Sequence, residues 1–273
     1  MKKLSLKQRK VLWLLVGLVC AGMLVYNAVV LIRWSLDRKG ILQETGEIEG
    51  VAGAEEIEDD ENTELVNPPT GDSDYWYYVG LPLTNVVIGE LKKINPDTVG
   101  FLSVAGTNIN YPVVQTTNNE YYLTRSFKKA VNSAGWIFMD YRNDANFNDK
   151  NTIVYGHGRL DRIMFSTLKN ILSTTWVKNK DNYVVRYSSE KENMLFQVFS
   201  VYTVPTESYY IQTDFVGESL YQEWLDVMIG RSMFDFGTSV NTGDKILTLS
   251  TCKDNNGENK VVMHAKLIKK SKK

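Results

Sequence analysis

The chain has 273 residues, of which 43% are hydrophobic and 23% are charged, and its net charge is −1. This length accommodates one full-sized domain with a sizeable core and further segments beside it. The balanced charge is not that of a nucleic-acid-binding protein, and the sequence has no nucleotide-binding glycine pattern or metal-ligand cluster. We therefore expect neither a nucleic-acid partner nor a metal site.

The charges are unevenly distributed along the chain. The first 39 residues contain eight Lys and Arg against one Asp, whereas Gly40 to Leu91 contains no Lys or Arg. Residues 11–32 form an apolar run, VLWLLVGLVCAGMLVYNAVVLI, of about the length that a helix needs to cross a bilayer. Because a basic flank stays cytoplasmic, we expect residues 1–10 to be a cytoplasmic tail, residues 11–32 a single transmembrane helix, and the rest extracellular.

Two other interpretations of this apolar run remain open. A cleaved signal peptide is less favoured, because the run is longer than a typical signal-peptide apolar region and no small-x-small cleavage site follows it. Lipoprotein processing at Cys20 is also less favoured, because Gly17 and Val19 occupy the positions at which Leu and a small residue are expected.

Residues 33–74 are predicted to be an acidic flexible linker. From about Gln43 to Asp74 the chain is rich in Glu and Asp, lacks aromatic residues and ends in NPPTGDSD. Such a segment cannot bury enough apolar surface to fold by itself, and repulsion between its carboxylates keeps it extended. We expect this linker to hold a folded domain, residues 75–273, away from the membrane.

The exported domain has the pattern of a mainly β protein, because aromatic and β-branched residues form short runs separated by turn sequences. A helix interrupts the strands late in the chain: in Gly217–Ser232, Leu220, Trp224 and Met228 recur every four residues and so share one helical face. Asn85–Ile94 also departs from the strand pattern. The predicted strands are Gly100–Val104, Tyr111–Gln115, Gly135–Tyr141, Thr152–Tyr155, Tyr183–Ser188, Met194–Val204, Lys245–Cys252 and Lys260–Ile268.

The exported domain contains one cysteine and two histidines. Cys20 lies in the membrane span, which leaves Cys252 without a partner for an internal disulfide. His264 lies in mid-strand, where a structural or surface role is the simpler interpretation. His157 follows a predicted strand and is flanked by glycines, an exposed and flexible setting that is typical of functional side chains.

Cys252 ends its predicted strand, in the sequence TLSTC that precedes KDNNGEN. A lone cysteine on a strand is more often a buried small hydrophobe than a nucleophile. At a strand end, however, a thiol is accessible to substrate, and Ser250 shares its face because strand residues alternate. An imidazole beside the thiol would supply the proton transfers of acyl transfer, so Cys252 and His157 form a coherent pair.

Several segments resemble the sortase family, and class B sortases in particular. TLSTC is similar to the TLxTC signature of sortases, and NTIVYGHGRLDRIMFSTL resembles the segment that carries their catalytic His. ELKKINPDTVGFLSVAGTNINYPVVQ, NNEYYLTRSF, SAGWIFMDYRN, ESYYIQTDF and DKILTLSTC occur in the order usual for class B, so the resemblance covers Ile88 to Ile268. It implies a sortase-type eight-stranded β-barrel with an N-terminal helix and a late inserted helix, anchored to the membrane of a Gram-positive bacterium.

The resemblance also implies a cysteine transpeptidase, in the class of thiol proteases and hydrolases, that needs no metal or organic cofactor. Cys252 would attack the carbonyl of a Thr in the C-terminal sorting motif of an exported protein and form a thioester, while His157 protonates the departing amine. The acyl group would then pass to an amine of a peptidoglycan cross-bridge or its lipid-linked precursor, or to a lysine of a pilin. The expected substrate contacts are Ser250, Thr251, Tyr209 and Tyr210.

One position departs from the family pattern. Sortases have an Arg on the strand after the Cys turn, and the matching position in GENKVVMHAKL is Lys260. We expect Lys260 to stabilise the oxyanion or hold the substrate backbone, although lysine offers a point charge and not the planar fork of arginine. The alternative function is a catalytically weak sortase homologue that serves as a peptide-binding or scaffold module.

Two other cysteine enzymes fit the sequence less well. An L,D-transpeptidase also has His before Cys, but its SHGC-type signature is absent. A papain-like protease has the opposite chain order, with Cys before His.

Overall fold

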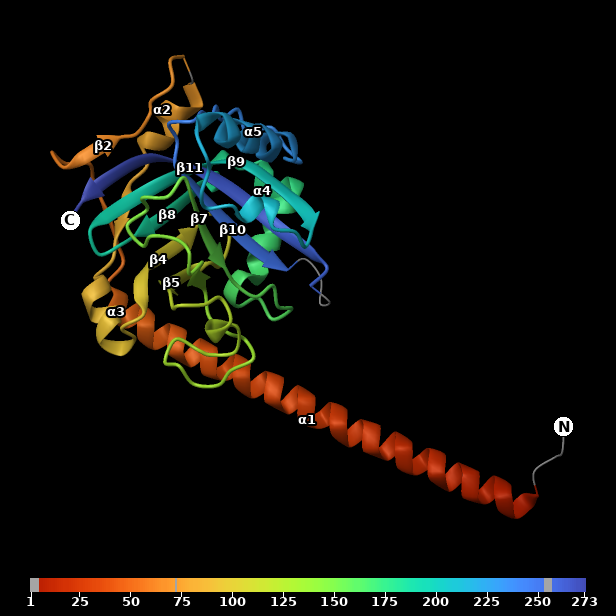
Figure 1. The fold of residues 1–273 in the computed structure, drawn as a ribbon. Coiled ribbons are helices and arrows are strands. Elements are labelled where there is room, and N and C mark those ends of the chain that lie inside the picture. Colours follow the sequence, from red (N-terminus) through yellow and green to blue (C-terminus); the bar gives the residue numbers. More distant parts are fainter. Residues whose placement is uncertain (1–4, 72, 253–256) are drawn as a thin grey trace. The chain divides into compact units, whose positions relative to one another are not determined.

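The computed structural model describes residues 5–71, 73–252 and 257–273, and for Ser73 and Cys252 it describes the backbone only. The chain divides into two compact units, Met1–Gly40 and Ile41–Lys273, which are considered separately. The first contains most of helix α1, which runs from Leu6 to Ala52 (Figure 1).

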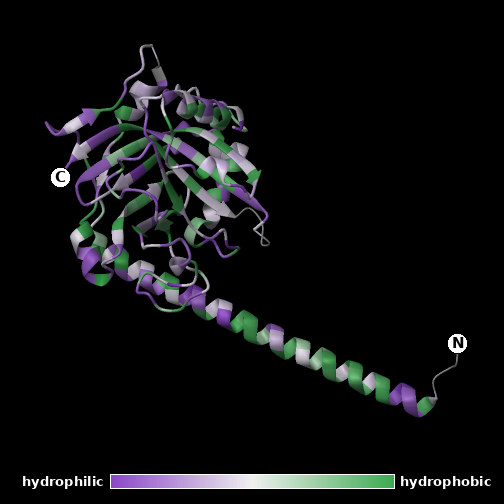
Figure 2. Cartoon of the chain, in the orientation of Figure 1, coloured by the Kyte–Doolittle hydropathy of each residue, from purple (hydrophilic) through white to green (hydrophobic). Residues whose placement is uncertain are grey.

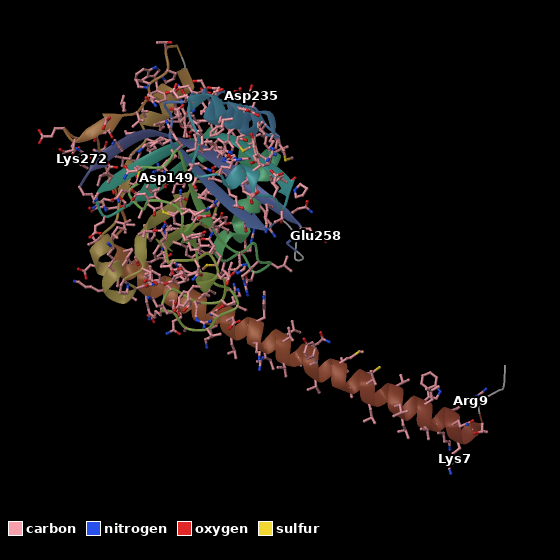
Figure 3. The ribbon with its side chains drawn as sticks, viewed as in Figure 1. Lys7, Arg9, Asp149, Asp235, Glu258 and Lys272 are labelled. Atoms are coloured by element: carbon pink, nitrogen blue, oxygen red, sulfur yellow. The ribbon has the colours of Figure 1, made fainter. Side chains whose placement is uncertain are left out.

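Helix α1 is long and apolar enough to be a candidate membrane span. Figure 2 shows a long hydrophobic stretch along it, and Figure 3 places the basic residues Lys7 and Arg9 near its beginning. The apolar run predicted from the sequence is therefore helical, with a basic flank on its N-terminal side.

Eight strands of the second unit form a closed β-barrel (Figure 1). Their order is β10-β7-β6-β5-β4-β8-β9-β11, and the pairing of β10 with β11 closes the ring. The pairs β5–β6 and β7–β10 are parallel, and the other six are antiparallel. The predicted eight-stranded barrel is confirmed. Its strands are β4 Thr98–Val104, β5 Asn110–Val114, β6 Phe138–Met139, β7 Asn151–Tyr155, β8 Val184–Ser188, β9 Glu192–Pro205, β10 Ile246–Cys252 and β11 Asn259–Lys272.

Short helices and three further strands complete the second unit. Helix α5, Glu218–Gly230, is the predicted late helix; it buries Trp224 and Met228 in a cluster that includes Val262 of β11, whereas Leu220 is 51% exposed. The remaining elements are β1 Glu55–Ile57, β2 Thr63–Leu65, α2 Ser73–Val79, β3 Leu83–Asn85, α3 Ile88–Ile94, η1 Tyr121–Leu123, η2 Met164–Leu172, α4 Thr174–Val177, η3 Lys180–Asn182 and η4 Tyr209–Ile211.

Strand β6 is shorter than the strand predicted for Gly135–Tyr141. Gly135 has a φ of 62°, outside the extended region, which ends the strand conformation on one side. On the other side a turn begins at Asp140, whose carbonyl accepts from the backbone N–H of Asn143 at 3.0 Å. Four residues lie between these two points. The first of them, Trp136, donates its backbone N–H to the Tyr122 carbonyl of η1 at 2.9 Å, and only the two residues of β6 form the strand.

The acidic segment is folded, which differs from the flexible linker predicted for residues 33–74. Helix α1 continues to Ala52, β1 pairs with β3, and β2 pairs with the C-terminal end of β11. Ile41 and Ile48 are buried in the core of the second unit. This unit therefore begins near residue 41 and not at residue 75.

Ion pairs explain why this segment is not extended. Asp59 contacts Lys269 of β11 at 2.6 Å, and Glu64 contacts Lys270 at 3.5 Å. The side chain of Lys269 is only 1% exposed, so Asp59 neutralises a charge that would be costly to bury alone. These lysines lie about 200 residues further along the chain, so the charge pattern of residues 33–74 alone shows only repulsion.

His264 is enclosed between β11 and helix α5. It is completely buried, with Nε2 2.8 Å from the Tyr202 hydroxyl and Nδ1 2.8 Å from Oγ1 of Thr248. Its ring also packs against Phe199 and Trp224. Burial, together with the charge of Arg231, lowers the pKa of His264 to about 3. These contacts agree with a structural role.

The stability of the fold should fall as the pH is lowered from 6.5 toward 3. In this window His264 binds a proton in the unfolded chain but not in the folded chain, so acid favours unfolding. Each pH unit should cost about 1.4 kcal/mol from this residue. Chemical denaturation of the full chain in detergent at pH 7.5 and pH 5.0 measures the loss. The variant His264→Gln should be less stable at pH 7.5 but lose less on acidification; equal losses for the two proteins would contradict this account.

Candidate active site

The ends of β7 and β10 bring His157 close to the end of the strand that carries Cys252. The two strands run parallel and stay in register up to Ser250, so both end at the same rim of the barrel. Beyond β7, the backbone N–H of Gly156 donates to the Ser250 carbonyl at 3.3 Å, and Thr251 Oγ1 donates to the Gly156 carbonyl at 2.8 Å. His157 is the next residue, so these bonds hold it beside the C-terminal end of β10.

A cavity of about 270 Å³ opens at this rim. It brings together five of the predicted site residues: His157, Lys260, Ser250, Thr251 and Tyr210. The other lining residues are Asn119, Leu123, Phe138, Tyr155, Gly156, Thr206, Glu207 and Ile211. Figure 3 labels Glu258 and Lys272 at the two ends of β11, and the cavity lies at the Glu258 end.

A larger hollow of about 690 Å³ lies at the other end of β11, away from these residues. It is lined by lysines and glutamates, among them Lys270 and Glu192, which form an ion pair at 3.3 Å. We place the candidate active site in the smaller cavity, because only there do an imidazole, hydroxyls and the strand of the thiol meet.

The imidazole of His157 is oriented by a backbone carbonyl. Its Nε2 lies 2.8 Å from the carbonyl oxygen of Leu123 at the end of η1. Because a carbonyl only accepts, this bond assigns the proton of the neutral ring to Nε2 and leaves Nδ1 as the nitrogen that can take up a proton.

Gly135 permits this contact. Its backbone passes so close that a Cβ atom would lie 2.6 Å from the Tyr122 carbonyl oxygen, 2.8 Å from that of Leu123 and 2.9 Å from Cδ2 of His157. Its positive φ is a second reason why glycine fits here. The orientation of His157 therefore depends on a residue 22 positions earlier in the chain.

The register of β10 and β11 places Lys260 directly opposite Cys252. Residues paired in this way have Cα atoms about 4.5–5.5 Å apart. The side chain of Lys260 lines the cavity. The thiol of Cys252 lies outside the part of the chain that the structure describes.

Two arginines near the site have acidic partners. Arg231 contacts Glu207 at 2.5 Å and lies over the rings of Tyr202 and Tyr209. Arg159 contacts the buried carboxylate of Asp161 at 2.7 Å. Among the described residues that line the cavity, Lys260 is the only lysine or arginine.

The predicted substrate contacts divide into two groups. Tyr210 is buried, and its hydroxyl lies 3.0 Å from Ser250 Oγ, so both belong to the floor of the cavity together with Thr251. Tyr209 does not line the cavity: its ring packs beneath Arg231, and its carbonyl accepts from the Trp224 indole at 3.0 Å. The short helix η4 turns adjacent tyrosines in different directions, which the sequence pattern did not reveal.

Sequence reasoning missed several lining residues, among them Asn119, Leu123, Glu207 and Tyr155. Tyr155 lies in the same motif as His157, so strand alternation could have suggested it. The others lie on loops or a short helix, and no local pattern marks them. Within the described ranges 5–71, 73–251 and 257–273, no three His, Cys, Asp or Glu side chains are grouped as a metal site would require.

The family pattern described as Sortase domain matches residues 102–268. Two relatives, both named Sortase B, are similar to this chain over 183 residues, which are 66% of the chain and 74% of each relative. The protein from Listeria monocytogenes is 36% identical and that from Staphylococcus aureus is 37% identical.

Solved structures of sortase B are also similar. The Staphylococcus aureus sortase B–substrate complex is 36% identical, with 67% of this chain and 84% of that chain covered and a TM-score of 0.62. Sortase B complexed with triglycine is 36% identical, with 67% and 87% covered and a TM-score of 0.62. Sortase B from B. anthracis in complex with AAEK1 is 32% identical, with 87% and 99% covered and a TM-score of 0.67.

The variant Gly135→Ala should displace the Leu123 carbonyl from His157. The added methyl group overlaps backbone atoms that cannot move independently, so the chain should also lose roughly 1–3 kcal/mol of stability. Because the chain has only two histidines, NMR spectra of the imidazoles can follow His157 directly, and the His264 signals should not move. Gly89→Ala is the control, since a Cβ there meets open space. An unchanged His157 signal in Gly135→Ala would refute the positioning role.

Proposed function

This chain belongs to the sortase family of cysteine transpeptidases, with class B members as its relatives, and we propose that Cys252 is its nucleophile and His157 its general acid and base. The observation that supports these roles best is the parallel pairing of β7 with β10, which holds His157 beside the strand end that carries Cys252. The same rim carries a cavity that can receive a peptide.

The proposed reaction has two halves. In the first, the sulfur of Cys252 attacks the carbonyl carbon of a Thr in the sorting motif of an exported protein, and the peptide C–N bond breaks as His157 protonates the departing amine. The product of this half is a thioester. In the second half an incoming amine attacks the thioester, His157 removes its proton, and the sulfur leaves as the thiolate.

The acceptor amine is proposed to belong to a peptidoglycan cross-bridge or its lipid-linked precursor, with a pilin lysine as the other possibility. Two similar structures support a peptide donor and an amine acceptor: one sortase B structure is a substrate complex, and another is a complex with triglycine. A short peptide with a free amino terminus is chemically equivalent to the end of such a cross-bridge.

We propose that Lys260 stabilises the oxyanion. The tetrahedral intermediate carries a negative oxygen next to Cys252, and Lys260 occupies the paired position on the neighbouring strand. A lysine ammonium can donate to that oxygen, although it lacks the second, coplanar donor of an arginine. The alternative of a catalytically weak homologue is not favoured, because the cation is retained at this position.

Helix α1 is proposed to anchor the enzyme in the cell membrane, with its basic N-terminal flank in the cytoplasm and the barrel outside. The apolar stretch of α1 and the position of Lys7 and Arg9 support this topology. In this location the enzyme meets its exported substrates as they leave the membrane.

Replacement of the nucleophile tests the proposed function. The full chain in detergent should cleave at least one peptide from a library of Pro- and Thr-containing fluorogenic peptides, and mass spectrometry should detect the acyl adduct. Cys252→Ala should abolish both signals, and His157→Ala should lower turnover roughly 10²- to 10⁴-fold. Cys20→Ala, which changes the other cysteine, should be fully active. Undiminished turnover by Cys252→Ala would exclude the mechanism.

The role of Lys260 can be tested separately. Lys260→Ala should lose on the order of 10²-fold or more in turnover, as removal of one oxyanion donor commonly does. Lys260→Arg should match or exceed the wild type, because the fork supplies a second donor. If Lys260→Ala is as active as the wild type, the donor lies elsewhere, and Arg231 is the next residue to test. Activity that is gained only by Lys260→Arg would favour the weak homologue.

The proposed topology predicts that the barrel is accessible to protease added to intact cells. The protein should also remain in the membrane fraction after washing with high salt, because an apolar helix and not surface charge holds it there. Immunoblots of protease-treated cells and of salt-washed membranes measure how much intact protein remains in each. A processed, freely secreted form as the major product would show that α1 is not an anchor.

A further inference from the structure

Asp140 connects the walls of the catalytic cavity, although it does not line the cavity itself. Its side chain is completely buried, with 0% exposed. The carboxylate accepts five hydrogen bonds: from the backbone N, Nε and Nη2 of Arg142 at 3.0, 2.9 and 2.7 Å, from the hydroxyl of Tyr155 at 2.8 Å, and from Nδ2 of Asn119 at 3.1 Å. Two carboxylate oxygens accept about four bonds in ideal geometry, so this acceptor is saturated.

Each partner of Asp140 leads to a different wall. Asn119 lies in the loop before η1, and Tyr155 ends β7. Arg142 extends the contact to η4, because its Nη2 also donates to the carbonyl of Ile211 at 2.9 Å. Asn119, Tyr155 and Ile211 all line the cavity, so one buried carboxylate connects three of its segments.

The carboxylate is ionised and the phenol is neutral. Burial works to raise the pKa of Asp140, but the hydrogen bonds from Arg142 and Tyr155 outweigh it and hold the pKa below its usual range. Burial and the charge of Asp140 raise the pKa of Tyr155, so its hydroxyl keeps the proton. Tyr155 is therefore the donor in its bond to Asp140.

These bonds determine how each wall group can contact a ligand. The proton of Tyr155 is committed to Asp140, so its oxygen is left as an acceptor. Asn119 donates one N–H to Asp140, and its side-chain oxygen accepts from the backbone N–H of Tyr141 at 3.0 Å, so its second N–H is left as a donor. The two groups lie within two hydrogen-bond lengths of each other, since both contact Oδ2 of Asp140.

We propose that Asp140 is a positioning residue that presents the Tyr155 oxygen and the Asn119 N–H as an acceptor–donor pair for one residue of an extended peptide substrate. In an extended chain the N–H and the C=O of one residue project to the same side, as in a hydrogen-bonded pair of a β-sheet. The substrate N–H bonds to Tyr155, and its C=O bonds to Asn119. The proposal rests on peptide transfer at this cavity and adds a mode of backbone recognition to it.

The test uses the full chain with Cys252→Ala in detergent, so that a bound peptide is not cleaved. The probe is a fluorescent peptide that the wild type cleaves, and anisotropy measures its binding. Tyr155→Phe should weaken binding about tenfold, as loss of one hydrogen bond can do, and Asp140→Asn should weaken it at least as much, because it releases both Tyr155 and Asn119. The double variant should bind no more weakly than Asp140→Asn alone, because Asp140 acts through Tyr155 and Asn119. Tyr183→Phe is the matched control and should bind normally, since its hydroxyl donates to the Val177 carbonyl outside the cavity.

A second measurement changes the ligand and does not depend on the folding of Asp140→Asn. Ester analogues of the probe replace each backbone N–H by oxygen in turn. One analogue should bind about tenfold more weakly than the amide peptide to the protein that keeps Tyr155. The same analogue and the amide peptide should bind equally well to the protein with Tyr155→Phe. Equal binding of all analogues, or additive losses for Tyr155→Phe and Asp140→Asn, would overturn the proposal while cleavage by the wild type still supports the proposed function. If the wild type cleaves no peptide and the Cys252→Ala protein binds none, both this proposal and the proposed function would be overturned.

Discussion

The pairing of β10 with β7 on one side and with β11 on the other is the constraint on which the site depends. It closes the barrel, and it brings three parts of the chain to one rim. The parallel pair carries His157 to the end of β10, and the antiparallel pair sets Lys260 opposite Cys252. A change of register by one residue would turn every side chain of β10 to the other face and separate the three groups.

Buried polar groups hold the surroundings of this rim in place. Asp140 is saturated by donors from Arg142, Tyr155 and Asn119, and His264 is bonded on both ring nitrogens beneath helix α5. Lys269 pairs with Asp59 and so attaches the acidic segment to the last strand. Each group would be costly to bury without its partners, so each partner helps to specify one arrangement of loops and helices.

Local patterns predicted much of the barrel and the main site residues. Alternation and turn residues located all eight strands, because a half-buried strand leaves that pattern in any sequence. The pattern overestimated the length of β6, since it could not show the positive φ of Gly135 or the turn at Asp140. It also treated Tyr209 and Tyr210 alike, although η4 directs only Tyr210 into the cavity.

The sequence by itself determined the class of the fold, the apolar helix, and Cys252, His157 and Lys260 as the candidate site, because each follows from local periodicity or from the resemblance of a short segment to the sortase family. Only the tertiary structure decided that the acidic segment is folded, that the Leu123 carbonyl orients His157, and that Asp140 connects the cavity walls. The physical reason is common to all three. These are contacts between groups far apart in the chain, and their energy depends on burial and direction, which no local pattern records.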